Sequence, residues 1–269
     1  MEAELAGWSA RQRRMKDVVL ERLAVGGLVL VGLARALDVD RGAVQGRADR
    51  AGEEGAVVIN SKETVEAVKY LVAAWKDAYD EGGLAWDDTN NNRAFLAGTI
   101  CSTLNAASIY IESVRRAEQY KTADGKPLKD DILHAPLPAG PKGQFGMHTF
   151  HSHVLPSYSR NQKAAKDLLR FIHKKENFEQ WFTTGQGFYT PGTESWETHP
   201  MWKQNPVMEP YAVAGKLGQT PGYKGEPNAR AAEVLSKYLI VNMFAGAIKG
   251  QSAEDAVRAC EAELKKIYA

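Results

Sequence analysis

The chain has 269 residues and a formal net charge of +1, from 34 Lys and Arg against 33 Asp and Glu. This near balance excludes the broad positive surface that sequence-independent nucleic-acid binding requires. The two cysteines, Cys101 and Cys260, are too few for a disulfide framework or a zinc motif, and we expect buried free thiols. The length suffices for one large domain or two domains of ordinary size.

Residues 1–55 differ in composition from the rest of the chain. They contain no Pro, Asn, Thr, Phe or Tyr, and translation of GC-rich DNA in a wrong frame would produce such a segment. The apolar run 23–33 follows a basic cluster, as in a secretory signal, but Asp17, Glu21 and Arg35 interrupt that pattern. We therefore expect no convincing signal peptide, and a segment that is disordered or forms a short helix.

A regular pattern begins at Val57. Residues 57–59 form a short apolar run that predicts a buried strand, and Ser61 is placed to cap a following helix. That helix is predicted because apolar residues recur at helical spacing until Gly82 and Gly83, namely Val65, Val68, Leu71, Val72 and Trp75. The next stretch, WDDTNNNR, is polar and predicts a surface loop followed by a helix cap.

The clearest pattern in the chain lies between residues 145 and 192. A strand is predicted at 151–155, and one long amphipathic helix follows, ended by Gly185 and Gly187. After this helix comes the loop sequence GQGFYTP. Two further helices are predicted near the C-terminus, one after Asn228 and one over the sequence SAEDAVRACEAELKKIY.

The order of these segments resembles family 1 extracellular solute-binding proteins, the sugar-binding components of ABC importers. The resemblance covers residues 57–269 and rests on five segments in the family's order. They are VVINSKETVEAVKYLVAAWKDAYDEG, then FLAGTICSTLNAASIY, which the resemblance makes a strand beginning at Phe95 and the start of a helix, the strand, helix and Tyr-x-Pro loop of 145–192, the GEPN segment, and the final helix. It implies an α/β fold of periplasmic-binding-protein type II that captures a sugar or polyol between two lobes for membrane permease subunits.

The resemblance also implies a domain organisation. Residues 56–145 correspond to the first part of the C-terminal lobe, 146–195 belong to the N-terminal lobe, and 196–269 return to helices of the C-terminal lobe. Residues 1–55 have no counterpart in the family's N-terminal lobe, so we expect an incomplete lobe and weak ligand binding. The long helix would then expose its apolar face.

Four candidate ligand-binding residues lie in the first half of this region. Sugars are held by planar amides and carboxylates for the hydroxyl groups and by an aromatic face for the C–H side of the ring. Asn105 matches the family's Asn at a strand-to-helix junction, although it could instead simply cap that helix. The family's Gly and Trp are replaced here, and Tyr110 is the nearest aromatic residue. Trp86 and Asp87 lie in a loop that borders the ligand in the family.

Four further candidates lie later in the chain. Tyr189 sits in the loop that resembles the family's cleft-bordering loop, with packing on its own lobe as the alternative. Tyr223 and Asn228 precede a helix whose start faces the cleft in the family. His151 lies on the predicted strand, where it shares a face with His153.

No catalytic or phosphate-binding signature is present, and no cofactor is expected. The histidines 148, 151 and 153 lack a nearby Cys, Asp or Glu in sequence, so we expect no metal site. The sequence thus predicts a non-enzymatic binding protein that is periplasmic in the intact family. A remnant that binds nothing and a small hydrolase that uses one of the histidines are the alternatives.

Overall fold

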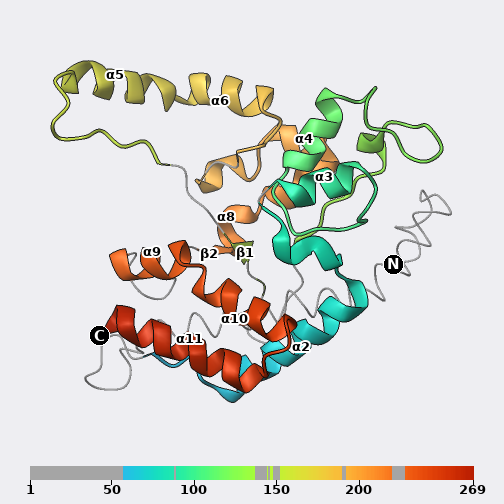
Figure 1. Cartoon of the computed structure of the whole chain (residues 1–269). Helices are drawn as coiled ribbons and strands as arrows, with labels where there is room; N and C mark the ends of the chain where they lie inside the picture. The colour runs from blue at the N-terminus through green and yellow to red at the C-terminus, as the bar shows by residue number, and fades with distance from the viewer. Residues whose placement is uncertain are drawn as a thin grey trace. The chain divides into compact units, whose positions relative to one another are not determined.

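A computed structural model describes residues 57–87, 89–136, 144, 146–147, 152–189, 192–219 and 228–269 (Figure 1). Segment 1–55 lies outside the described residues. The chain divides into two compact units, which are treated separately below. Unit 1 comprises Met1–Leu84, Leu137–Met147 and Gln219–Ala269, and unit 2 comprises Ala85–Pro136 and His148–Gly218. The expected lobe boundaries near residues 145 and 195 stay a prediction.

Unit 1 is a helical assembly. Its described helices are α2 (Lys62–Ala78), α9 (Ala229–Ser236), α10 (Leu239–Ile248) and α11 (Ala253–Tyr268). Helix α10 contacts both α2 and α11, and these two contact each other, as Figure 1 shows. The core between them is apolar, and its most enclosed members are Ile59, Val68, Val257 and Leu264.

The start of α2 confirms the predicted cap but corrects the predicted strand before it. The Oγ atom of Ser61 accepts a hydrogen bond from the backbone N–H of Thr64 at 3.2 Å. Ile59 is fully buried, yet residues 57–59 form no strand. The carbonyl of Ile59 accepts hydrogen bonds from the Ser61 N–H and the Thr64 hydroxyl, so it serves the helix start and no sheet ladder.

Helices α9 and α10 form one apolar stretch, Ala229–Ile248, that is long enough to cross a membrane by length and composition. The stretch is interrupted at Tyr238, whose φ of 52° lies in the left-handed region. Met243, Phe244 and Ala247 of α10 are buried in the core of unit 1. Only part of the stretch packs in this core, since 22% of it is buried and Val241 is 58% exposed.

Unit 2 contains short helices around a second core. Its α-helices are α3 (Asn90–Leu96), α4 (Ser108–Arg115), α5 (Gln162–Ile172), α6 (Lys175–Thr184), α7 (Pro200–Gln204) and α8 (Ala214–Leu217). Single 3-10 turns lie at Leu128–Asp130, Glu194–Trp196 and Pro206–Tyr211, and another, Glu81–Ala85, joins the two units in sequence. Phe182 and Met208 are almost fully buried, and Trp202 is buried in the same core.

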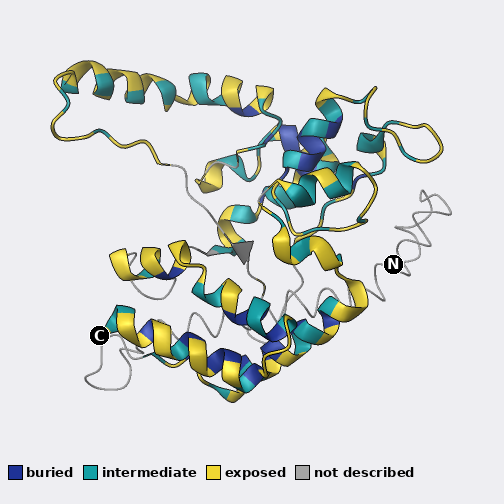
Figure 2. Cartoon of the chain, in the orientation of Figure 1, coloured by how far each residue is buried: buried dark blue, intermediate teal, exposed yellow. Residues whose placement is uncertain are grey.

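The predicted long helix is two helices, α5 and α6, with a break at His173 and Lys174. Lys174 is extended, and the side chain of Asn177 donates to the carbonyl of Phe171 at 2.6 Å, which satisfies a carbonyl at the end of α5. No residue of α5 is buried, and Figure 2 shows this helix as mostly exposed. Leu168 and Phe171 are more than half exposed, in agreement with the expected exposed apolar face.

Strands are few among the described residues. The two-residue strands β1 (Gly146–Met147) and β2 (Gly218–Gln219) form a two-stranded sheet. The strand predicted at 151–155 is wrong for its described part, 152–155, and Phe95 lies in α3, where a strand was expected. The described part is therefore helix-rich, and the α/β class stays a prediction. Cys260 is buried as expected, but Cys101 is exposed.

Candidate functional site

Asn105 belongs to a small amide and hydroxyl network at the start of α4. Its Nδ2 atom donates to Oδ1 of Asn92 at 2.8 Å and to Oγ of Ser108 at 3.1 Å. Asn92 in turn donates to the same Oγ at 2.9 Å. The N-cap residue of α4 is Ala107, which makes no side-chain cap, so Asn105 does not cap this helix. Its amide is held in place by α3 and α4 and is half-buried.

Tyr110 is placed in the core of unit 2. Its side chain is only 8% exposed, and its hydroxyl donates to Oδ1 of Asn205 at 3.2 Å. The ring of His134 lies edge-on to Tyr110, with 5.7 Å between the ring centroids. Little of this ring is accessible, and a ligand-binding role of Tyr110 stays a prediction.

Tyr189 is the predicted aromatic residue that the structure leaves accessible. It is 43% exposed, and its ring stacks on that of Trp181 with 4.9 Å between centroids and 14° between planes. Trp181 is itself 50% exposed. The two rings form an exposed aromatic pair, and the ring of Phe188 lies edge-on to Tyr189 with 4.7 Å between centroids.

The turn before Tyr189 depends on Gly187. Gln186 and Gly187 have φ angles of 52° and 74°, in the left-handed region where glycine carries no steric penalty. A Cβ atom on Gly187 would lie 2.8 Å from Cζ3 of Trp202 and 2.9 Å from Cε of Met201. The glycine therefore lets the chain pass against buried side chains before it reaches the exposed aromatic pair.

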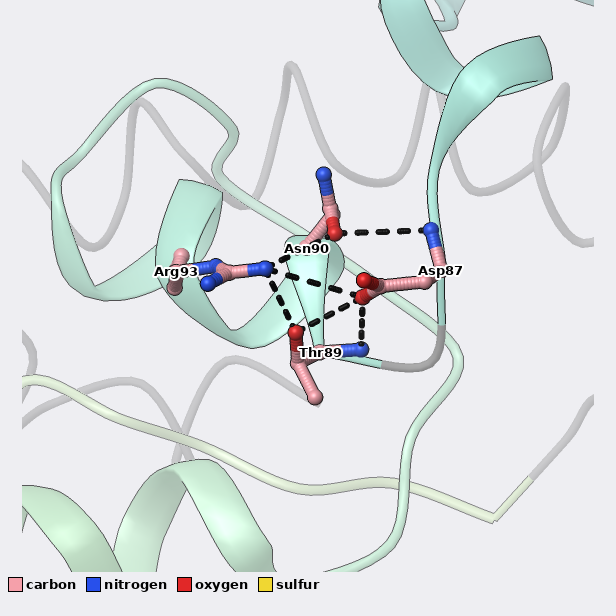
Figure 3. Close-up of polar contacts among 4 residues, drawn as sticks. All are labelled: Asp87, Thr89, Asn90 and Arg93. Carbon is pink, nitrogen blue, oxygen red and sulfur yellow. Dashed lines mark hydrogen bonds and ion pairs between the residues drawn. The ribbon is translucent and has the colours of Figure 1, made fainter.

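Asp87 organises the start of α3 (Figure 3). Its Oδ1 atom accepts hydrogen bonds from the N–H of Thr89 at 2.8 Å and from the Thr89 hydroxyl at 2.6 Å. Nη2 of Arg93 lies 3.6 Å from the same oxygen. These contacts, the Thr89 hydroxyl first, lower the pKa of Asp87. The carboxylate thus has a local structural role, and the neighbouring Trp86 is half-buried.

The remaining candidates lie in unit 1 or outside the described residues. Asn228 belongs to unit 1, where its Oδ1 atom accepts from the N–H of Ala231 at 2.9 Å and caps α9. His151 and Tyr223 lie outside the described residues. Among the residues that the structure describes, no group of three or more His, Cys, Asp or Glu side chains could hold a metal ion.

A small polar hollow in unit 2 was not predicted from the sequence. It has a volume of about 200 Å³ and is lined by Gly192, Thr193, Glu194, Glu197, Gly215 and Lys216. Nζ of Lys216 lies 2.5 Å from Oε2 of Glu197, and the hydrogen bond to this carboxylate raises the pKa of Lys216. Two residues of chain lie between Tyr189 and Gly192, so their Cα atoms are at most ~11 Å apart.

The signal for this hollow was weak in the sequence. Helix α7 and the 3-10 turn Pro206–Tyr211 lie between Glu197 and Lys216 in the chain. The local sequence around either residue does not predict that they pair. Trp181 follows Phe178 by three residues, so helical spacing places both on one face, and this spacing does not predict that Trp181 is 50% exposed. Only the Tyr189 loop pointed to this part of the chain.

The family model described as bacterial extracellular solute-binding protein matches residues 39–210. The match begins inside segment 1–55 and includes both halves of unit 2. Comparison with curated proteins gives no match. Proteins of the family are generally non-enzymatic, have an ABC-type solute-binding role, and are extracellular or periplasmic in their intact form. Since the match covers more than half of the sequence, the chain belongs to the bacterial extracellular solute-binding protein family.

Proposed function

We propose that the chain is the substrate-binding component of an ABC transporter for a monosaccharide or polyol, which it delivers to membrane permease subunits outside the cytoplasm. The observation that carries the choice of ligand is the hollow with the Glu197–Lys216 pair, close in the chain to Tyr189. The proposal includes the α/β fold of the periplasmic-binding-protein type II class. It rests on the family for the transport role and on unit 2 for the ligand chemistry.

The chemistry of the hollow suits a neutral polyhydroxyl ligand. A carboxylate accepts hydrogen bonds at two oxygens and an ammonium group donates three, so a paired Glu and Lys retain capacity for further hydroxyl groups. Because Glu194 also lines the hollow, its charged side chains sum to −1, which disfavours an anionic ligand. Thr193 adds a hydroxyl that can both donate and accept.

The size of the hollow argues for a small ligand and for weak binding. Its volume of about 200 Å³ is below the ~300–1,000 Å³ that is usual for pockets of drug-sized ligands. Tyr110 offers little accessible ring as a second aromatic face, because it is buried. We therefore expect millimolar affinity, near ~4 kcal/mol of binding free energy.

Calorimetric titration of the purified chain with a panel of monosaccharides and polyols tests this proposal. We expect at least one ligand to bind, and Glu197→Gln to weaken its binding. Glu233→Gln is the control, because Glu233 of α9 forms an ion pair with Lys237 at 2.6 Å in unit 1, in a more exposed position than Glu197. Equal effects of the two variants would contradict the assigned hollow, and no binding of any ligand would favour the non-binding remnant.

The fate of the ligand distinguishes the hydrolase alternative from the binding role. After prolonged incubation with the protein, chromatography should recover a bound disaccharide or glycoside intact. Cleavage that scales with protein concentration would contradict the binding role.

A further inference from the structure

Two histidines of unit 2 that are far apart in sequence converge at the protein surface. Nδ1 of His153 lies 3.0 Å from Nε2 of His173, and the ring centroids are 5.1 Å apart with an interplanar angle of 72°. The sequence singled out His153 but not its partner, which stands at the C-terminal end of α5. Neither the family role nor the proposed sugar site makes use of this pair.

The backbone and ring of His173 are fixed by contacts within α5 and with Phe178. The N–H of His173 donates to the carbonyls of Leu169 and Phe171, and its ring stacks on Phe178 at 6.3 Å and 13°. His153 lies in the extended segment that precedes α5 by several residues. Both side chains are exposed, so an ion and its remaining water ligands can reach the two nitrogens.

We propose that His153 and His173 form a surface binding site for a divalent transition-metal ion of the Ni²⁺ or Cu²⁺ type. With metal–nitrogen bonds of ~2.05 Å, two nitrogens 3.0 Å apart subtend an angle of about 94° at the ion. This is close to the right angle between neighbouring ligands in square-planar or octahedral coordination. A tetrahedral zinc ion needs nitrogens ~3.3 Å apart, so zinc would require the pair to open slightly.

The ion would replace the hydrogen bond that now joins the rings. Each neutral imidazole must present a lone pair at the nitrogen concerned, so the ring that donates in the hydrogen bond moves its proton to its other nitrogen. No net proton is released when both rings are neutral. Water fills the other coordination positions, and the ion links the segment around His153 to the end of α5.

The test uses the full chain without a histidine tag, freed of metal by chelation and titrated calorimetrically with Ni²⁺. We expect a saturable site with one ion per chain, and His153→Gln or His173→Gln should each weaken it at least ~tenfold, since loss of even an outer-shell partner costs ~10–100-fold. Glutamine keeps a polar side chain of similar reach at exposed positions, so both variants should fold, as circular dichroism would verify.

His134→Gln is the control, because it replaces a histidine of unit 2 whose Nδ1 atom lies 2.8 Å from the carbonyl oxygen of Val207 and takes no part in the pair. It should bind Ni²⁺ as tightly as the unmodified chain. Ni²⁺ should also raise the melting temperature of the unmodified chain and leave that of the double variant unchanged. The proposal is overturned by the absence of saturable binding, by binding that survives both substitutions, or by an equal loss in His134→Gln.

Discussion

Replacement of Gly187 by alanine should destabilise unit 2 strongly. The backbone φ of 74° costs an alanine ~1–2 kcal/mol, because the left-handed region brings its Cβ too close to the following carbonyl oxygen. The new Cβ would also lie 2.8–2.9 Å from atoms of Trp202 and Met201, which are buried and have little room to move. Overpacking of this kind costs ~1–3 kcal/mol. Together the two effects predict a loss of ~2–5 kcal/mol.

Gly98→Ala separates the two effects. Gly98 has the same φ of 74° and also belongs to unit 2, but a Cβ there would meet nothing within 4 Å. It should therefore cost only the backbone strain of ~1–2 kcal/mol. Urea unfolding followed by tryptophan fluorescence measures both variants against the unmodified chain. Equal losses of unfolding free energy in the two variants would refute the assigned contact of Gly187 with Trp202 and Met201.

Two further predictions concern stability. Ser61→Ala should lower the unfolding free energy by ~1 kcal/mol in denaturant titrations, because the N–H of Thr64 loses its cap, whereas Ser61→Asp should retain stability. Burial lowers the pKa of His134 below its ordinary value of 6.5, so the unfolded chain binds the proton more readily. Its contribution to stability should therefore be constant above pH 6.5 and fall as the pH drops below it. This dependence should be absent in His134→Gln, and an unchanged dependence in that variant would contradict the burial of the ring beside Tyr110 and Tyr211.

Helices in this chain could be predicted where their causes are local. The apolar periodicity of 62–78 and the hydroxyl of Ser61 act within one or two turns, and both appear in the structure as expected. The break between α5 and α6 could not be predicted, because neither Gly nor Pro marks it. It depends on Asn177 turning back to a carbonyl of the previous helix and on burial of Phe182 in the core.

Strands were harder to predict because a short apolar run does not specify its partner. Ile59 is buried as expected, but its carbonyl is bound by the start of α2. Phe95 was assigned to a strand by resemblance, whereas the asparagine-rich stretch before it begins a helix. In both cases the secondary structure depends on which groups the backbone bonds to, and the tertiary structure determines those partners.

The candidate site was predictable only in part, because it too depends on contacts between segments that are distant in the sequence. The loop that carries Tyr189 was recognised by its glycines and aromatic residues, and the structure leaves this tyrosine exposed. In the sequence, nothing distinguishes Tyr110 from an aromatic residue that could contact a ligand, because its packing against His134 is a tertiary contact. The pairing of Glu197 with Lys216, like that of His153 with His173, joins segments about 20 residues apart and has no local signature.

The central claim, that this chain of the solute-binding family captures a sugar or polyol, is tested most directly by saturation-transfer NMR with a ligand panel. We predict transfer to the C–H protons of at least one monosaccharide or polyol, with millimolar affinity, and loss of this transfer in Tyr189→Ala. Phe171→Ala is the matched control, since it removes another exposed aromatic ring. The absence of transfer to every ligand of the panel, or transfer that is unchanged in Tyr189→Ala, would contradict the account.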